Sequence, residues 1–268
     1  MPLEHVAIDC NDNCIAHQWV IRDMPELARA VAYIVAGASY HAEKIISGIK
    51  GTSPRIDKAI DSAISKIYLT PAVEMEDKAP LWHRDGLLFQ AISWIAANLE
   101  KPSNALIAAP HVIKAHKGLD GLLVNIDNND ICLTIFEDKA GNPEGLITKI
   151  MTEFREMEFD DSYKAEEILQ ETATLLRMHR PEGWEDLIND AFWLKNRKYR
   201  ASLASLDSHC TETGAQHLFR NFGKAVLGPV DRRIGHLMAS DDVRKFFRNF
   251  AKNVIDELNA IKTPVVAA

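Results

Sequence analysis

Three charged side chains lie beside two apolar segments in the middle of the sequence. Asp120 is near the start of a segment over residues 119–127, and Glu137 and Lys139 are near the end of a second segment over residues 130–139. Two carboxylates and one ammonium group in this pattern are typical of a site that binds a divalent cation and hydrolyses a phosphodiester bond. Asp120 and Glu137 would hold the cation, and Lys139 would orient the attacking water or help to deprotonate it.

The turn between the two segments predicts how they pair. Residues 127–130 read Asp-Asn-Asn-Asp, and asparagine tolerates the positive φ of a type I′ hairpin turn. With the two asparagines as the loop, Asp120 comes directly opposite Glu137. Lys139 shares their face because side chains alternate along a strand, whereas Asp138 points to the other face. The hairpin alone therefore predicts a cluster of all three charged groups.

The spacing of the two carboxylates indicates which ion they would bind. Opposed residues of a hairpin lie roughly 4.5–5.5 Å apart at Cβ, where two carboxylates repel each other unless a cation bridges them. Mg²⁺ is the natural cofactor for such oxygen ligands, with Mn²⁺ as an alternative. A hairpin edge with an ordinary Glu–Lys pair is the plainer interpretation, because this spacing also arises by chance. The position of the charges at the end of a strongly apolar strand favours the functional interpretation.

Basic side chains near this pattern are candidates for DNA contact. His116 and Lys117 come shortly before Asp120, and a second basic segment contains Lys195, Arg197, Lys198 and Arg200. Both segments would suit a phosphate backbone, although such charges also suit a solvated surface. The net charge of -7 argues against a protein that coats nucleic acid without specificity.

The composition is that of a globular protein, with 47% hydrophobic and 26% charged residues. The first residues lack the pattern of a signal peptide, and no apolar run approaches the length of about 18 residues needed to cross a membrane. Four cysteines do not form an obvious disulfide framework. We therefore expect a cytoplasmic protein without a membrane partner. Cys10, Cys14 and His17 supply too few ligands for a structural zinc site unless His5 joins them.

Helical spacing dominates on both sides of the predicted hairpin. The first 80 residues read mainly as helices and predict a helical N-terminal extension (1–80). A mostly apolar helix at about 86–99, for which Asp85 is the expected cap, precedes the hairpin, and a helix that starts at Asn142-Pro143 follows it. Further helices are expected at about 163–178, 183–195 and 241–261.

The fold class indicated by this order is α/β in the broad sense (α+β). A small mixed sheet would be flanked by helices within residues 81–261, and residues 262–268 would form a flexible tail. In the helix before the hairpin, Gln90 is the candidate polar ligand, and the acidic residue Glu100 comes only at its C-terminal end. A further acidic metal ligand from this helix is therefore in doubt.

The segments around the charged residues resemble a known superfamily. Residues 116–121 read His-Lys-Gly-Leu-Asp-Gly and residues 134–139 read Thr-Ile-Phe-Glu-Asp-Lys. They are similar to the core of the PD-(D/E)xK, or restriction-endonuclease-like, superfamily. More narrowly, the stretch from about 105 to 200, with PHVIKAHKGLDGLLV and FEDKA, resembles the HamA family, the effector nucleases of the Hachiman antiphage defence system. Leu119 stands where some members have proline.

This resemblance implies a restriction-endonuclease-like core, with helices around a mixed sheet. It also implies an endonuclease that cleaves DNA with Mg²⁺, at a catalytic site made by Asp120, Glu137 and Lys139. The implied partner is a superfamily 2 helicase of the HamB type, and the sequence itself contains no Walker-type phosphate loop. Two other functions stay open: a noncatalytic helical adaptor or interaction protein, and a hydrolase that acts on RNA.

Overall fold

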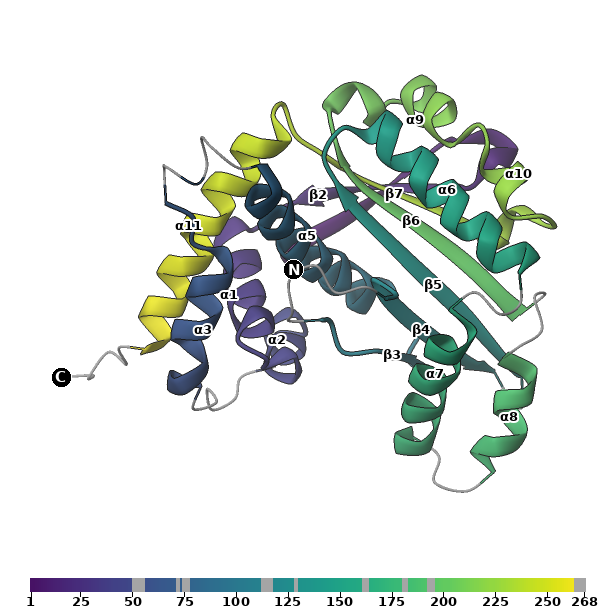
Figure 1. Cartoon of the computed structure of the whole chain (residues 1–268), viewed down its shortest axis with the longest axis horizontal. Coiled ribbons are helices and arrows are strands. Elements are labelled where there is room, and N and C mark those ends of the chain that lie inside the picture. Colours follow the sequence, from purple (N-terminus) through teal and green to yellow (C-terminus); the bar gives the residue numbers. More distant parts are fainter. Residues whose placement is uncertain are drawn as a thin grey trace.

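A computed structural model describes residues 1–49, 56–70, 73, 78–111, 118–127, 130–160, 164–179, 183–191 and 196–262. Within these residues, one mixed sheet of seven strands has the order β1-β2-β7-β6-β5-β4-β3 (Figure 1). The strands are β1 (Leu3–Ile8), β2 (Ile15–Ile21), β3 (Ala105–Ile107), β4 (Gly121–Asp127), β5 (Asp130–Ala140), β6 (Arg197–Ser205) and β7 (Arg233–Ala239).

The centre and the edges of the sheet differ in strand direction. β2, β7, β6 and β5 run parallel to one another, whereas β1–β2, β4–β5 and β3–β4 are antiparallel pairs. Parallel strands are normally buried on both faces. The mixed sheet expected from the sequence is therefore confirmed, and its parallel centre accounts for the burial of β6 and β7.

Helices cover both faces of the sheet (Figure 1). One face packs against α1 (Met24–Val35), α2 (Ser39–Ile46), α3 (Asp57–Ile67), α5 (Lys78–Glu100) and α11 (Val243–Lys262). The other face packs against α6 (Pro143–Phe159), α7 (Ala165–His179), α8 (Trp184–Ala191), α9 (Glu212–Phe219) and α10 (Phe222–Ala225). Single 3₁₀ turns occupy Asn11–Asn13, Asp207–Cys210 and Val230–Arg232.

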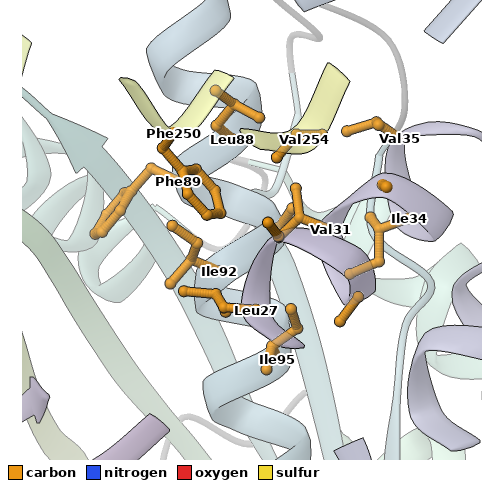
Figure 2. Close-up of a cluster of buried hydrophobic side chains, with 14 of the residues drawn as sticks. Leu27, Val31, Ile34, Val35, Leu88, Phe89, Ile92, Ile95, Phe250 and Val254 are labelled. Carbon is orange, nitrogen blue, oxygen red and sulfur yellow. The ribbon is translucent and has the colours of Figure 1, made fainter. Parts of the chain in front are cut away.

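Two hydrophobic cores lie on opposite faces of this sheet. On the α5 face, Leu27, Leu88 and Phe250 interdigitate between α1, α5 and α11 (Figure 2). On the α6 face, Phe154 packs against Tyr199 and Phe222, with ring centroids 5.0 and 5.8 Å away. Burial of such side chains is the main favourable term in folding, so each core holds its layer of helices to the sheet.

Helix starts follow local sequence signals. The Asp23 side chain accepts a hydrogen bond from the Glu26 amide, 2.9 Å away, before α1. Asn142 accepts one from the Glu144 amide, 3.2 Å away, and Pro143 opens α6. The predicted start of α6 is confirmed, and the helices expected at 163–178 and 241–261 correspond to α7 and α11. Every helix among the described residues is too short or too polar to cross a lipid bilayer.

The structure corrects three predictions about the elements. The N-terminal 80 residues are not only helical, because β1 and β2 belong to the same sheet as the rest of the chain. The burial along β1 and β2 does not alternate strictly, so the two-residue period of a strand is weak there. Asp85 caps no helix, and the helix expected at about 86–99 begins earlier, at Lys78. Of the helix expected over 183–195, the structure describes α8 over Trp184–Ala191, and residues 192–195 lie outside the described residues.

Candidate active site

The β4–β5 hairpin has the register that its sequence predicts. Leu122 pairs with Ile135, and Val124 pairs with Leu133. The two asparagines of the predicted turn, residues 128 and 129, lie outside the described residues. Gly121 pairs with Phe136, and a Cβ on Gly121 would lie only 2.6 Å from the Phe136 ring. Glycine therefore leaves room for the Phe136 ring next to Asp120.

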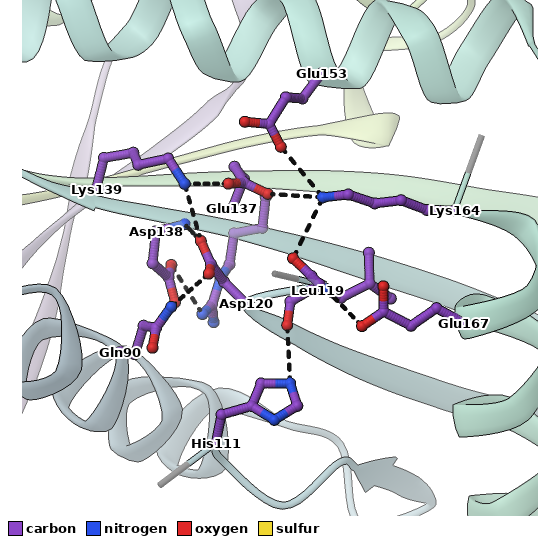
Figure 3. A network of polar contacts seen from close by, with 12 residues as sticks. Gln90, His111, Leu119, Asp120, Glu137, Asp138, Lys139, Glu153, Lys164 and Glu167 are labelled. Atoms are coloured by element: carbon purple, nitrogen blue, oxygen red, sulfur yellow. Dashed lines mark hydrogen bonds and ion pairs between the residues drawn. The ribbon is translucent and has the colours of Figure 1, made fainter. Parts of the chain in front are cut away.

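Asp120, Glu137 and Lys139 meet where this hairpin joins the parallel part of the sheet (Figure 3). The Lys139 ammonium lies 3.3 Å from Asp120 Oδ2 and donates a hydrogen bond to Glu137 Oε1. The Asp138 amide donates to Asp120 Oδ2 over 2.7 Å, and the Gln90 side chain donates to Asp120 Oδ1. Both oxygens of Asp120 are thus fixed by neighbouring donors.

Lys164 is a further charged residue of the site that the sequence interpretation missed. Its ammonium lies 3.2 Å from Glu153 Oε2 on α6 and 3.8 Å from Glu137 Oε2 (Figure 3). It also donates to the Gly118 carbonyl over 3.3 Å. The Lys164 backbone has a φ of 55°, in the left-handed region that costs energy for a residue with a Cβ. Nothing in its sequence context indicates this role, since it lies far from the hairpin along the chain.

Side chains from other elements hold the loop that carries Asp120. The His111 ring nitrogen Nε2 lies 3.1 Å from the Leu119 carbonyl oxygen. The Leu119 amide donates to Glu167 Oε1 on α7 over 2.8 Å. The peptide groups on both sides of Leu119 are therefore anchored, which restrains the residue that follows it.

Burial sets the electrostatics of the two carboxylates. Glu137 is 2% exposed, and this burial raises its pKa well above the usual range, with Asp120 and Glu153 adding to the shift and the lysines opposing it. Burial would lower the pKa of Lys139, but the charges of Asp120 and Glu137 outweigh it and raise that pKa. The Lys139 ammonium is therefore a stable positive charge beside a Glu137 carboxyl group that is costly to ionise.

A divalent cation fits this donor set. Among the described residues, Glu137 Oε2 is buried and accepts no hydrogen bond, although Lys164 lies nearby. The clustered carboxylates of Asp120, Glu137 and Glu153 outnumber the two lysines that face them. Oxygen ligands with excess negative charge are what Mg²⁺ and Mn²⁺ require. Glu153, on α6 rather than α5, is the further acid near the site.

A groove of about 520 Å³ opens beside Asp120 and Lys139. It runs between the N-terminal half of α5 and the start of α6, and its lining includes Trp82, Lys149 and Arg244. Arg244 also forms an ion pair with Asp85. The volume lies in the range of about 300–1,000 Å³ that is usual for ligand sites, and its cationic side chains suit a phosphate group.

The basic segment predicted to contact DNA lies largely inside the protein. Arg197 and Arg200 are 2% and 3% exposed on opposite faces of β6, so the prediction that they contact DNA was wrong. β6 lies between β5 and β7 with helices on both faces, and this position buries its side chains. Lys198 is half-buried and lies 3.1 Å from Asp231. The other three predicted contacts, His116, Lys117 and Lys195, fall outside the described residues.

Comparison with known proteins identifies no relative from which a function could be inferred. No protein-family model matches the chain, and no curated protein matches it. The functional interpretation consequently rests on the geometry of Asp120, Glu137 and Lys139. This geometry combines two carboxylates that can hold a cation, a lysine between them and an adjacent groove.

Proposed function

We propose that this protein is a metal-dependent phosphodiesterase, and that its substrate is DNA. The observation that carries the proposal is the convergence of Asp120 and Glu137 on the Lys139 ammonium at the edge of a groove. A structural ion pair needs one carboxylate for each lysine. Here three carboxylates, one of them the buried Glu137, face two lysines, and such an excess is costly for folding and typical of a functional site.

Each residue has a task in this proposal. Asp120 and Glu137 hold Mg²⁺ or Mn²⁺, and Gln90 and the Asp138 amide keep Asp120 in one orientation. The bound cation supplies charge that polarises the phosphodiester and promotes ionisation of water. Lys139 donates a hydrogen bond to the attacking water or to a phosphate oxygen. Lys149 and Arg244 bind the phosphate backbone along the groove.

The narrower proposal is an effector nuclease similar to the HamA family, with a restriction-endonuclease-like core. Its support is the resemblance of the segments around Asp120 and Lys139, together with a mixed sheet that has helices on both faces. The same resemblance supports a superfamily 2 helicase as partner and a cytoplasmic location. A nuclease of this kind endangers its own cell, so control by a partner is consistent with it.

Plasmid cleavage tests the proposal directly. Supercoiled DNA is incubated with the full chain and Mg²⁺, Mn²⁺ or EDTA, alone and with the product of the neighbouring gene plus ATP. We expect metal-dependent cleavage that falls about 10²–10⁴-fold in Lys139→Ala, and comparably in Glu137→Gln, because each loses a group that acts in the transition state. Lys252→Ala and Asp256→Asn are matched controls on the exposed side of α11 and keep full activity.

The outcomes separate the competing functions. Cleavage of RNA but not of single-stranded or duplex DNA would keep the site and replace the substrate. Equal cleavage by wild type, Glu137→Gln and Lys139→Ala would refute the assignment of the site. No cleavage of any substrate by folded protein with its partner present would favour the noncatalytic adaptor.

A further inference from the structure

Histidines and a glutamate gather on the α5 face of the sheet, at some distance along it from the hairpin site. His17 on β2 and His236 on β7 are direct partners in the parallel pairing of these strands. Glu100, the last residue of α5, lies over them, with its Oε2 3.6 Å from His236 Nε2. One ligand atom from each of the three residues lies within 4.8 Å of the others.

His5 on β1 adds a further imidazole to this cluster. Its Nδ1 lies 3.5 Å from Glu100 Oε1, and its ring centroid lies 6.2 Å from that of His236. His5 pairs with Trp19, two residues from His17 along β2, so all three histidines belong to one face of the sheet. Three neighbouring strands and one helix thus each contribute one potential ligand.

Each of the three histidines has a buried ring nitrogen without a hydrogen-bond partner among the described residues. His236 is 2% exposed, and among the described residues its Nδ1, the Nε2 of His5 and the Nδ1 of His17 are buried without a partner. Unpaired buried polar atoms cost free energy, so their accumulation at one place needs a compensating role.

The Arg200 guanidinium faces the cluster, and the neighbouring Asp138 carboxylate partly compensates its positive charge. Arg200 donates a hydrogen bond to Ser93, lies 3.8 Å from Asp138, and stacks over the Phe136 ring at 3.4 Å. A cavity of about 270 Å³ is lined by Glu100, His236 and Arg200. This cavity gives an ion a route to Glu100 and to the buried imidazole of His236.

We propose that His17, Glu100 and His236, with His5 as a fourth donor, form a Zn²⁺ site. Tetrahedral zinc with bonds of about 2.0–2.1 Å places its ligands roughly 3.3 Å apart. The Glu100 Oε2–His236 Nε2 distance of 3.6 Å is close to this spacing, and one ligand atom of His17 lies within 4.8 Å of both residues. Imidazole nitrogens select zinc over Mg²⁺, so the site is chemically distinct from the carboxylate cluster. A bound ion would tie the end of α5 to β1, β2 and β7.

Metal binding to the full chain without an affinity tag tests this site. Zn²⁺ is titrated by calorimetry, and Co²⁺ is used as a coloured substitute whose absorption reports its ligands. We expect one ion per chain, and an affinity at least about tenfold lower in His17→Gln and in Glu100→Gln, since each loses a ligand. His217→Gln, an exposed histidine on α9, is the matched control and binds as wild type does.

Stability gives a second measurement that is independent of nuclease activity. Zn²⁺ at a concentration close to the wild-type Kd should raise the Tm of wild type and of Glu137→Gln more than that of Glu100→Gln, because the stabilisation depends on the ratio of free ligand to Kd. Unchanged zinc affinity in both ligand variants would overturn the proposal. Thiolate-to-cobalt charge-transfer bands would also overturn it, because they would place the ion on the neighbouring thiols of Cys10 and Cys14.

Discussion

Asp120 and Glu137 are held in different ways, and this difference suits different tasks. Asp120 has both oxygens engaged by Gln90, the Asp138 amide and Lys139. Glu137 has one oxygen engaged by Lys139, while the other accepts no hydrogen bond among the described residues. In the proposed nuclease, Asp120 is the rigid ligand, and Glu137 supplies a free oxygen to the cation.

His41 contributes to the pH dependence of the free energy of unfolding. His41 on α2 is 4% exposed, and its ring centroid lies 4.3 Å from that of Tyr33. Burial, followed by the charges of Lys44 and Arg29, lowers its pKa in the folded protein. The unfolded chain then binds the proton more tightly, so this stabilisation is complete above about pH 6.5 and is lost as the pH falls towards the folded pKa.

Replacement of His41 should remove that contribution. We expect the free energy of unfolding of His41→Gln to fall less between about pH 7.5 and 5.5 than that of wild type. Urea unfolding at several pH values measures the difference, with His217→Gln at an exposed position as control. An identical pH slope in wild type and His41→Gln would contradict the prediction.

The sequence predicts only those residues of the candidate site that the β4–β5 hairpin brings together. Asp120, Glu137 and Lys139 follow from one turn and the alternation of side chains, which are local rules. Lys164 and Glu153 reach the site only through the packing of α6 and α7, so no local pattern reveals them. Arg197 and Arg200 were misplaced because charge usually indicates exposure, and a central strand overrides that tendency here.

At the scale of elements, α5 links the site to the rest of its helical layer. Its Asp85 is buried and accepts hydrogen bonds of 2.9 and 3.0 Å from the Arg84 side chain. The other Asp85 oxygen accepts a hydrogen bond from Arg244 on α11. A charged group therefore lies at the contact between α5 and α11, where the surrounding side chains are mainly apolar.

Removal of the Asp85 carboxylate should destabilise the protein strongly. Asp85→Ala removes a buried carboxylate that accepts hydrogen bonds from Arg84 and Arg244, which we expect to cost about 3–5 kcal/mol in the free energy of unfolding. Asp256→Ala, at an exposed position on α11, should change it by about 0.5 kcal/mol or less. Chemical denaturation of both variants measures this, and equal stabilities would show that the Asp85 network contributes little.

Helices were easier to predict than strands in this chain. α6 and α11 carry one clear apolar stripe, and a strong cap marks the start of α6. β4 and β5 are joined by a recognisable turn, but β2, β6 and β7 pair with strands distant in sequence. Long-range pairing leaves no local signal, so these strands were assigned as helix or left without assignment.

At the scale of the whole molecule, both hydrophobic cores depend on the same sheet. Successive residues of β6 point to opposite faces, so Tyr199 belongs to the α6-face core and Ala204 to the α5-face core. Loss of the sheet would expose both layers at once. We therefore expect the two cores to unfold in one cooperative transition.

Core substitutions on either face test this cooperativity. Leu88→Ala on the α5 face and Ile150→Ala on the α6 face each remove a fully buried side chain, which we expect to cost about 2–5 kcal/mol. Each variant should shift the whole urea transition, with tryptophan fluorescence and far-UV circular dichroism giving the same midpoint. A variant that moved only one of two separate phases would show that the layers unfold independently.

The pairing of β2 with β7 also has a consequence for synthesis on the ribosome. Ile15 pairs with Ile234, so the β1–β2 hairpin leaves the ribosome long before the strand that joins it to the sheet. β5, which carries Glu137 and Lys139, likewise cannot pair with β6 until β6 has been translated. A nascent chain therefore cannot complete the scaffold of the proposed nuclease until most of it has been translated. The order of translation would thus keep an incomplete chain from cleaving nearby DNA.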